Sequence, residues 1–308
     1  MKLYLALGFA LAASPLAAEE VSCPKVPEPV ISLGFGSRYT DDSANRSEFD
    51  EESDKAVTAA LKPIDTFITD LAKQTDILKD PETKPEAADA AAACVLDAIR
   101  VWAKADALSE LTTLGANLSA PSRVGGIAFA YAAVFAHDPA LPRDAEIEAW
   151  LLDRARQTMS FFDTEAPTRA SQNNLRAWAG LAVTQVGLIL QDEALIDWGE
   201  GTVELVVCTA APDGSLPNEM WRGKLALHYQ LHAVAPLVAS TALLQEARPD
   251  LFATCDRALP RVVAFTLAAL KDPETVKTIT GKEQTVGGPK KPARDFELAW
   301  VPAYLRLD

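Results

Sequence analysis

The residues with the clearest chemical potential are an amide, a guanidinium and a phenol from two separate segments of the chain. Asn174 ends an Asn-Asn pair, Arg222 ends the string PNEMWR at 217–222, and Tyr229 follows seven residues after Arg222. Seven residues are almost two turns of an α-helix, so Arg222 and Tyr229 are expected to share one helical face. Such groups can neutralise a carboxylate and move a proton on the neighbouring carbon, as elimination across a uronic acid ring requires.

The same residues also have purely structural interpretations. Asn173 and Asn174 follow the segment TRAS, and asparagine is favoured at a helix N-cap. Without the other segment, Arg222 and Tyr229 would be ordinary polar residues on a helix. The dipeptide DG at 213–214 predicts a turn between helices under either interpretation.

The tryptophans divide into two groups by their surroundings in the sequence. Trp102, Trp178 and Trp198 lie at helical spacing among apolar residues, which favours core positions over sugar-binding platforms. Trp221 directly precedes Arg222 and is therefore a candidate for stacking on a sugar ring. We predict that Trp221 contacts the substrate.

The beginning of the chain has the pattern of an export signal. Its first residues, MKLYLALGFALAASPLAAEE, combine an early lysine, a short apolar run and small residues at the end. This pattern predicts a signal peptide at 1–18 and a single domain at 19–308, which the 308-residue length permits. The apolar run is too short to span a membrane, and no later stretch is long and apolar enough. We expect a periplasmic protein that does not span a membrane.

Four cysteines follow the predicted signal peptide, and an even number in an exported chain favours disulfides. We favour pairing Cys23 with Cys94, which would tie an N-terminal arm to a helix. Cys208 would then pair with Cys255 and join two consecutive helices. No CxxC spacing supports a zinc site, and buried free thiols are the alternative.

The charge balance restricts the possible partners. The formal net charge is −14 at pH 7. This argues against nucleic acid, which requires a basic surface. It also weighs against a polyanionic substrate, although a local basic cleft can overcome it, because the Debye length is only about 8–10 Å.

Hydrophobic patterning predicts an almost entirely helical chain. An extended arm and a mobile polar loop are expected at 19–50, where prolines precede a polar run. Amphipathic patterns cover 143–163 and 192–210, whereas 177–190 is apolar nearly all round and 225–244 is similar, with a kink expected at Pro236. Alternating amphipathic and apolar helices favour an all-α, α/α toroid of outer and inner helices, with a plain helical bundle as the alternative.

Several strings of the chain resemble the alginate lyases of polysaccharide lyase family 5. They are PEPVISLGFGSRYTDDSANRSEFDEE at 27–52, CVLDAIRVWAKADAL at 94–108, NNLRAWAGLAV at 173–183, DWGEG at 197–201, DGSLPNEMWRGKLALHY at 213–229 and FELAWVPAY at 296–304. The resemblance spans nearly all of the predicted mature chain. It implies an incomplete (α/α)6 toroid with a deep groove and a lid loop, and β-elimination of 1,4-linked uronate polymers.

The resemblance also implies roles for individual residues. Asn174 and Arg222 match positions that neutralise the substrate carboxylate, and Tyr229 matches the acid/base tyrosine. In mannuronate the C5 proton and O4 lie on the same side of the ring, so one phenol can serve both steps. Arg38 and Tyr39 match the lid loop and are expected to contact the substrate. The implied partner is an anionic polysaccharide, bound by a monomer.

Position 175 departs from the family pattern. Members carry histidine directly after the second asparagine, whereas this chain has Leu175. Loss of one preorganised donor typically costs about 10²–10³ in rate. His232 lies one helical turn after Tyr229 and is a candidate replacement that would bind substrate, and Arg176 could add positive charge. A satisfied, partly buried His232 and a solvent-exposed Arg176 are the simpler alternatives.

Two functions therefore remain open. The first is a periplasmic lyase for mannuronate-rich alginate or a related polyuronate, and the second is a catalytically impaired protein that binds or guides such a polysaccharide. Other chemistries lack their signatures. His228 and His232 have zinc-helix spacing, but no glutamate follows His228, and the chain has neither a GxSxG elbow nor a Walker loop. No metal or cofactor is predicted.

Overall fold

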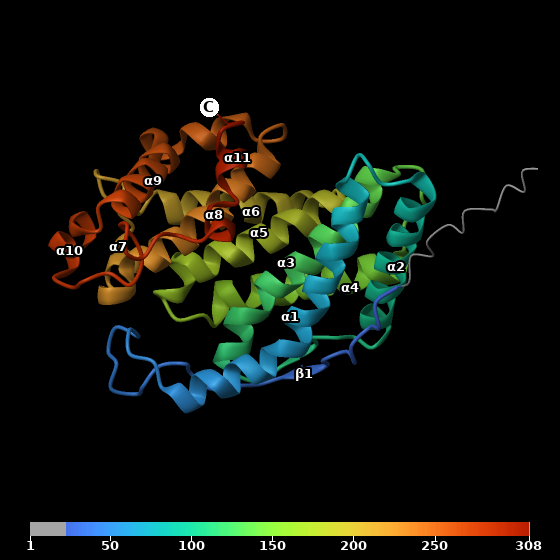
Figure 1. Cartoon of the computed structure of the whole chain (residues 1–308), viewed down its shortest axis with the longest axis horizontal. Coiled ribbons are helices and arrows are strands. Elements are labelled where there is room, and N and C mark those ends of the chain that lie inside the picture. Colours follow the sequence, from blue (N-terminus) through green and yellow to red (C-terminus); the bar gives the residue numbers. More distant parts are fainter. Residues whose placement is uncertain (1–22, 308) are drawn as a thin grey trace, which may run out of the picture.

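Helices provide nearly all of the regular structure in the computed structural model, which describes residues 23–307 (Figure 1). The predicted signal peptide at 1–18 lies outside the described residues. The α-helices are α1 (Glu51–Lys79), α2 (Pro85–Lys104), α3 (Leu114–His137), α4 (Ala145–Thr164), α5 (Asn174–Leu190), α6 (Glu193–Val207), α7 (Pro217–Met220), α8 (Ala226–Leu244), α9 (Thr254–Lys271), α10 (Glu274–Thr280) and α11 (Val301–Tyr304). None of them combines the length and the apolar character that a membrane span requires.

The helix α5 lies at the centre of the arrangement, as its nearly uniform apolar sequence predicts. It packs against α3, α4, α6 and α8. Its close approach to α6 depends on two glycines. A Cβ at Gly180 would come within 2.5 Å of Thr202, and one at Gly199 within 2.0 Å of Thr184. The amphipathic helices α4 and α6 lie outside α5, so the predicted α/α toroid of inner and outer helices is confirmed. Helix α8 continues through Pro236.

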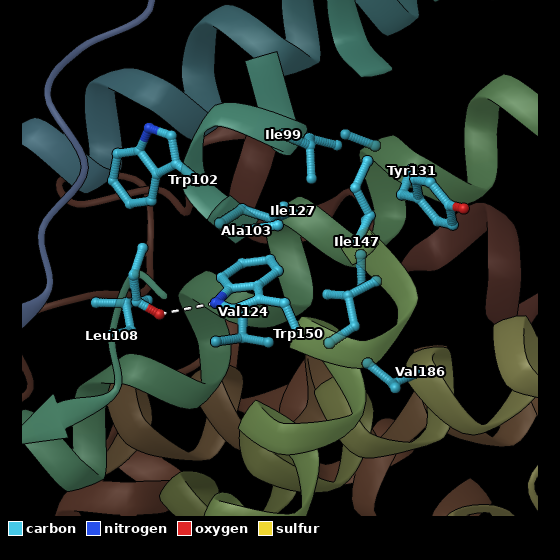
Figure 2. Packing of buried hydrophobic residues seen from close by; sticks show 14 of the residues in the cluster. Ile99, Trp102, Ala103, Leu108, Val124, Ile127, Tyr131, Ile147, Trp150 and Val186 are labelled. Atoms are coloured by element: carbon cyan, nitrogen blue, oxygen red, sulfur yellow. Dashed lines mark hydrogen bonds between the residues drawn. The ribbon is translucent and has the colours of Figure 1, made fainter. Parts of the chain in front are cut away.

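One end of the core is built around large aromatic side chains from α1, α2 and α4. Trp102 is fully buried and stacks on Phe67 with ring centroids 4.3 Å apart. Trp150 donates its indole N–H to the carbonyl oxygen of Ala107 at 2.8 Å, in the cluster drawn in Figure 2. The core position predicted for Trp102 is therefore confirmed.

The N-terminal arm is attached along the outside of the toroid. Its short strand β1 (Ser32–Leu33) pairs in parallel with β2 (Glu110–Leu111). Trp102 also donates to the carbonyl oxygen of Pro27 at 3.3 Å. The arm continues into residues 34–50, called the lid loop below, which leads into α1 and lies beneath α7 in Figure 1.

Both favoured disulfides are present, and one differs from expectation in what it joins. Cys23 pairs with Cys94 and ties the arm to α2. Cys208 pairs with Cys255 and connects the end of α6 to the first turn of α9. These two helices are not consecutive, because α7 and α8 lie between them. The second disulfide therefore closes a loop that contains Arg222 and Tyr229, whereas Asn174 on α5 lies outside it.

Removal of this second disulfide should destabilise the protein. The Cys208→Ser/Cys255→Ser variant opens a loop of sequence separation 47. The unfolded chain then gains conformational entropy, so we expect the free energy of unfolding to fall by about 2–4 kcal/mol. Urea unfolding of the oxidised protein and of the variant measures the difference. Equal midpoints would show that this loop contributes no such constraint.

Candidate functional site

A cleft of about 270 Å³ lies between the lid loop and helices α1, α3, α5 and α8. It brings together side chains from distant parts of the chain, such as Tyr39 and Tyr229, which are 190 residues apart. The polar and aromatic residues that line it are Arg38, Tyr39, Arg46, Arg123, Asn174, Trp178, Arg222, His228, Tyr229 and His232. The cleft therefore contains every residue predicted to bind or transform substrate except Trp221.

Arg222 and Tyr229 meet in the cleft, but they do so in a different way from the one predicted. They are not on one helix, because α8 begins at Ala226 and Gly223 has a φ of +57°. This conformation suits glycine, and a Cβ there would also come within 2.8 Å of Asn45. The chain thus turns after Arg222, and the guanidinium carbon lies 3.6 Å from the centroid of the Tyr229 ring.

The amide of Asn174 is held by a buried carboxylate. Asn173 is the N-cap of α5 and accepts from the backbone N–H of Leu175 at 2.9 Å, so the N-cap interpretation holds for this residue. Asn174 is the first residue of the helix. Its backbone N–H and its side-chain N–H donate to the two oxygens of Glu219 at 2.7 and 3.0 Å. No role was predicted from the sequence for Glu219, which lies within the string PNEMWR.

The environment of Glu219 makes its proton unusually tightly bound. Burial raises the pKa of Glu219 to about 7, although the hydrogen bonds from Asn174 and the charge of Arg222 oppose the shift. Asn174 Oδ1 is buried and has no hydrogen-bond partner within residues 23–307. A protonated carboxyl, or a glutamine at this position, can donate to that oxygen once the Asn174 amide rotates.

Glu219→Gln should therefore change how stability depends on pH. The folded state raises the pKa from 4.5 to about 7, so this carboxyl stabilises the fold fully below about pH 4.5 and loses that contribution as the pH rises to about 7. At about 1.4 kcal/mol per pKa unit, the loss is roughly 3 kcal/mol. In urea unfolding, we expect the free energy of unfolding of wild type, relative to that of Glu219→Gln, to fall by that amount between about pH 4.5 and pH 7. A difference that does not vary with pH would contradict the prediction.

The hydroxyl of Tyr229 is bonded to the lid loop. It forms a short hydrogen bond with the hydroxyl of Tyr39, which the lid loop carries. Burial raises the pKa of Tyr229, the charge of Arg222 opposes the shift, and Tyr39 adds to it. Tyr229 is therefore a neutral phenol in this state, and Arg222 is the group that favours its ionised form.

The lid loop also binds Arg222 and its neighbours. Arg222 donates through Nε to the carbonyl oxygen of Asn45 at 3.1 Å and through Nη2 to that of Arg46 at 2.6 Å. Lys224 forms an ion pair with Glu48 at 2.5 Å. Arg38 pairs with Asp54 in the first turn of α1. The loop predicted to be a mobile polar segment is thus docked across the cleft.

Helix α5 presents Leu175 and Trp178 to the cleft, but not Arg176. Leu175 and Trp178 both line the cleft. Arg176 is only 7% exposed, pairs with Asp163 at 2.8 Å, and lies 3.9 Å from the ring centroid of Trp198. Its predicted contribution to the charge of the cleft is therefore wrong, and so is its alternative as a solvent-exposed residue, because α5 turns this position towards α6.

The interpretation of Trp178 as a core residue is also wrong. Its indole N–H donates to Nδ1 of His232 at 2.8 Å, at the edge of the cleft. His232 lies on α8, with its ring centroid 6.2 Å from that of Tyr229. His228 completes the group, 5.0 Å from Tyr229 by the same measure. Helical periodicity could not distinguish a core tryptophan from one on the wall of an internal cleft.

Trp221 lines a second, smaller pocket beside the cleft. This pocket has a volume of about 150 Å³ and shares Arg46, Leu118, Leu175 and Arg222 with the cleft. The guanidinium of Arg169 lies 4.2 Å from the centroid of the Trp221 ring, which is 36% exposed. An exposed aromatic face with an adjacent cation suits a second negatively charged sugar, so the predicted role of Trp221 remains a prediction with a suitable geometry.

The charged side chains of the cleft are all cationic. Arg38, Arg46, Arg123 and Arg222 contribute to its wall, and none of the described lining residues is an aspartate or glutamate. Arg38 and Arg123 have carboxylate partners at the rim, whereas Arg46 and Arg222 form no ion pair within residues 23–307. The cleft is therefore locally basic although the net charge of the chain is −14.

Comparison with known proteins supports the resemblance in the sequence. Residues 85–276 match the model of the alginate lyase family. The chain belongs to the alginate lyase family. The matched segment includes Asn174, Arg222 and Tyr229, whereas Arg38 and Tyr39 precede it.

Relatives of this alginate lyase family member cover most of its length. A polysaccharide lyase of Stenotrophomonas maltophilia (strain K279a) is 31% identical over 85% of this chain and 77% of the relative. An alginate lyase of Pseudomonas syringae pv. tomato is 30% identical over 93% of this chain and 75% of the relative. Among solved structures, alginate lyase A1-III as a His-to-Ala variant complexed with a tetrasaccharide has a TM-score of 0.74 and 25% identity, over 90% of this chain and 76% of that one.

Proposed function

We propose that this protein is a periplasmic lyase that cleaves 1,4-linked polyuronates, mannuronate-rich alginate in particular, by β-elimination. The observation that carries the proposal is the position of the Arg222 guanidinium 3.6 Å from the Tyr229 ring, in a cleft with only cationic charged side chains. Family membership favours polysaccharide cleavage, and the tetrasaccharide complexes of alginate lyase A1-III support an oligosaccharide as the occupant of the cleft.

The chemistry begins at the substrate carboxylate. The C5 proton of a uronate becomes acidic enough to remove only when the negative charge of the carboxylate is offset by hydrogen bonds or cations. Asn174 gives one side-chain N–H to Glu219 and has a second N–H for the substrate. Arg222 supplies the positive charge.

Tyr229 then moves the protons. Its ionised oxygen removes the proton from C5, and the electron pair of that bond forms the C4–C5 double bond. The C4–O4 bond breaks, and the tyrosine hydroxyl returns the proton to O4, which leaves as the new hydroxyl of the released chain. Arg222 assists because its charge lowers the pKa of Tyr229.

Substrate binding must also displace the lid loop contacts. The hydroxyl of Tyr39 bonds to that of Tyr229, and two lid-loop carbonyl oxygens accept from Arg222. A uronate carboxylate is a stronger acceptor for a guanidinium than a carbonyl oxygen is. Displacement of these contacts would free the Tyr39 hydroxyl to bind the substrate, and Arg38, which also lines the cleft, is the second lid-loop side chain expected to contact it.

The test is a lyase assay on polymannuronate, polyguluronate and other polyuronates, because each elimination creates an unsaturated end that absorbs ultraviolet light. We expect the largest rate on polymannuronate. A protein that binds these polymers and yields no unsaturated product from any of them would instead have the second function, non-catalytic polysaccharide binding. Leu175 is the observation that favours this second candidate, since it places an apolar side chain beside Asn174 in the cleft.

A further inference from the structure

The contact between Trp178 and His232 determines which nitrogen of the histidine carries a proton. The Trp178 indole N–H donates to Nδ1 of His232 at 2.8 Å. An indole nitrogen can only donate, so Nδ1 must be the accepting, unprotonated nitrogen. The proton of a neutral imidazole then resides on Nε2.

His232 is neutral under ordinary conditions. Protein packed around the ring lowers the pKa of His232 to about 4, and the neighbouring His228 and the positive charge of Arg123 act in the same direction. The side chain is nevertheless accessible to solvent from the cleft. The hydrogen bond from Trp178 goes to Nδ1, and Nε2 forms no hydrogen bond with any described residue of the chain. His232 thus offers a free N–H to whatever occupies the cleft.

The other donors of the cleft are already partly committed. Asn174 gives one side-chain N–H to Glu219, and Arg222 gives Nε and Nη2 to the lid loop. Leu175, one helical turn before Trp178 on α5, contributes no polar atom. A carboxylate bound beside Tyr229 would therefore find in His232 an additional neutral donor.

We propose that Trp178 holds His232 in its Nε2–H tautomer, so that His232 donates a hydrogen bond to the carboxylate of a bound uronate and cannot serve as the base at C5. This inference rests on the proposed function for the identity of the ligand. His232 is then a residue that contacts substrate, and Trp178 is a positioning residue that acts through it.

The tautomer is measured directly by NMR of the wild-type protein with ¹⁵N-labelled histidine. We expect a protonated Nε2 and an unprotonated Nδ1 for His232, and a mixture of tautomers in Trp178→Phe, which lacks the indole donor. Addition of a saturated mannuronate oligomer should shift the Nε2 resonance of wild type. An unprotonated Nε2 in the wild-type protein would overturn the inference.

Kinetics on polymannuronate separate a donor from a base. His232→Phe, which has no N–H, should lower kcat by about 10²–10³. His232→Gln retains an N–H near the position of Nε2 but cannot accept the proton from C5, and it should stay within about tenfold of wild type. Equal, large losses in both variants would identify a base and contradict the proposal, as would an unchanged kcat in His232→Phe.

The control variant is His137→Gln. His137 lies at the end of α3, outside the cleft, and contacts Asp89 at 3.3 Å. Its kcat should equal that of wild type. If wild type itself fails to cleave any polyuronate, the proposed function fails, while the NMR experiment still decides the tautomer and the contact of His232 with the oligomer.

Discussion

Tyr229→Phe should abolish elimination while polymer binding is retained. The hydroxyl is proposed to act first as base and then as acid, and each such role contributes about 10²–10⁴ in rate. We therefore expect kcat to fall at least about 10³-fold on polymannuronate. The phenyl ring retains the contact with the Arg222 guanidinium, which lies 3.6 Å from the ring centroid. The loss should consequently appear in kcat and hardly in KM.

Tyr304→Phe is the matched control for this experiment. Tyr304 ends α11 and packs near Phe252 and Trp300, away from the cleft lining. Removal of its hydroxyl should leave kcat unchanged. An undiminished rate in Tyr229→Phe would mean that another group moves the proton, and the proposed mechanism would be wrong.

Arg222→Met should have the second largest effect and should also change the pH dependence. Loss of the guanidinium removes the positive charge beside the substrate carboxylate, so kcat should fall by about 10²–10³. The charge of Arg222 lowers the pKa of Tyr229. Without it the pKa of Tyr229 rises, and the ascending limb of the pH–rate profile should move to higher pH.

Arg222→Lys separates charge from geometry. Lysine keeps a positive charge but lacks the planar fork that reaches the carbonyl oxygens of Asn45 and Arg46. We expect its pH–rate profile to resemble that of wild type, with a reduced kcat. If the profiles of Arg222→Met and wild type coincide, Arg222 does not govern the ionisation of Tyr229.

Local contacts account for what could be predicted from the sequence alone. The uniform apolar pattern of 177–190 predicted an inner helix, because only a helix surrounded by other helices can bury every face. The N-cap role of Asn173 and the turn at 213–214 likewise follow from the local preferences of asparagine and glycine. Four cysteines after a predicted signal peptide similarly predicted disulfides, and the favoured pairing is confirmed.

The tertiary structure alone decided how the cleft is assembled. The backbone turns at Gly223, between Arg222 and Tyr229. These two side chains therefore meet across a turn and not along one helix. Trp178 was predicted to be a core residue, but it lies on the wall of the cleft. There it bonds to His232, a residue 54 positions later in the chain on another helix. Sequence spacing specifies neighbours within one helix, whereas contacts between helices depend on packing that no local pattern encodes.

The residues of the site and their arrangement thus have separate origins. From the sequence by itself, the residue types and the resemblance of the surrounding strings to alginate lyases point to uronate chemistry. Only the folded chain brings the carboxylate of Glu219 to Asn174, Trp178 to His232, and the lid loop to Arg222. The physical reason is that the free energy contributed by a hydrogen bond depends on its burial and on its partner. Both are determined by how helices distant in sequence pack together.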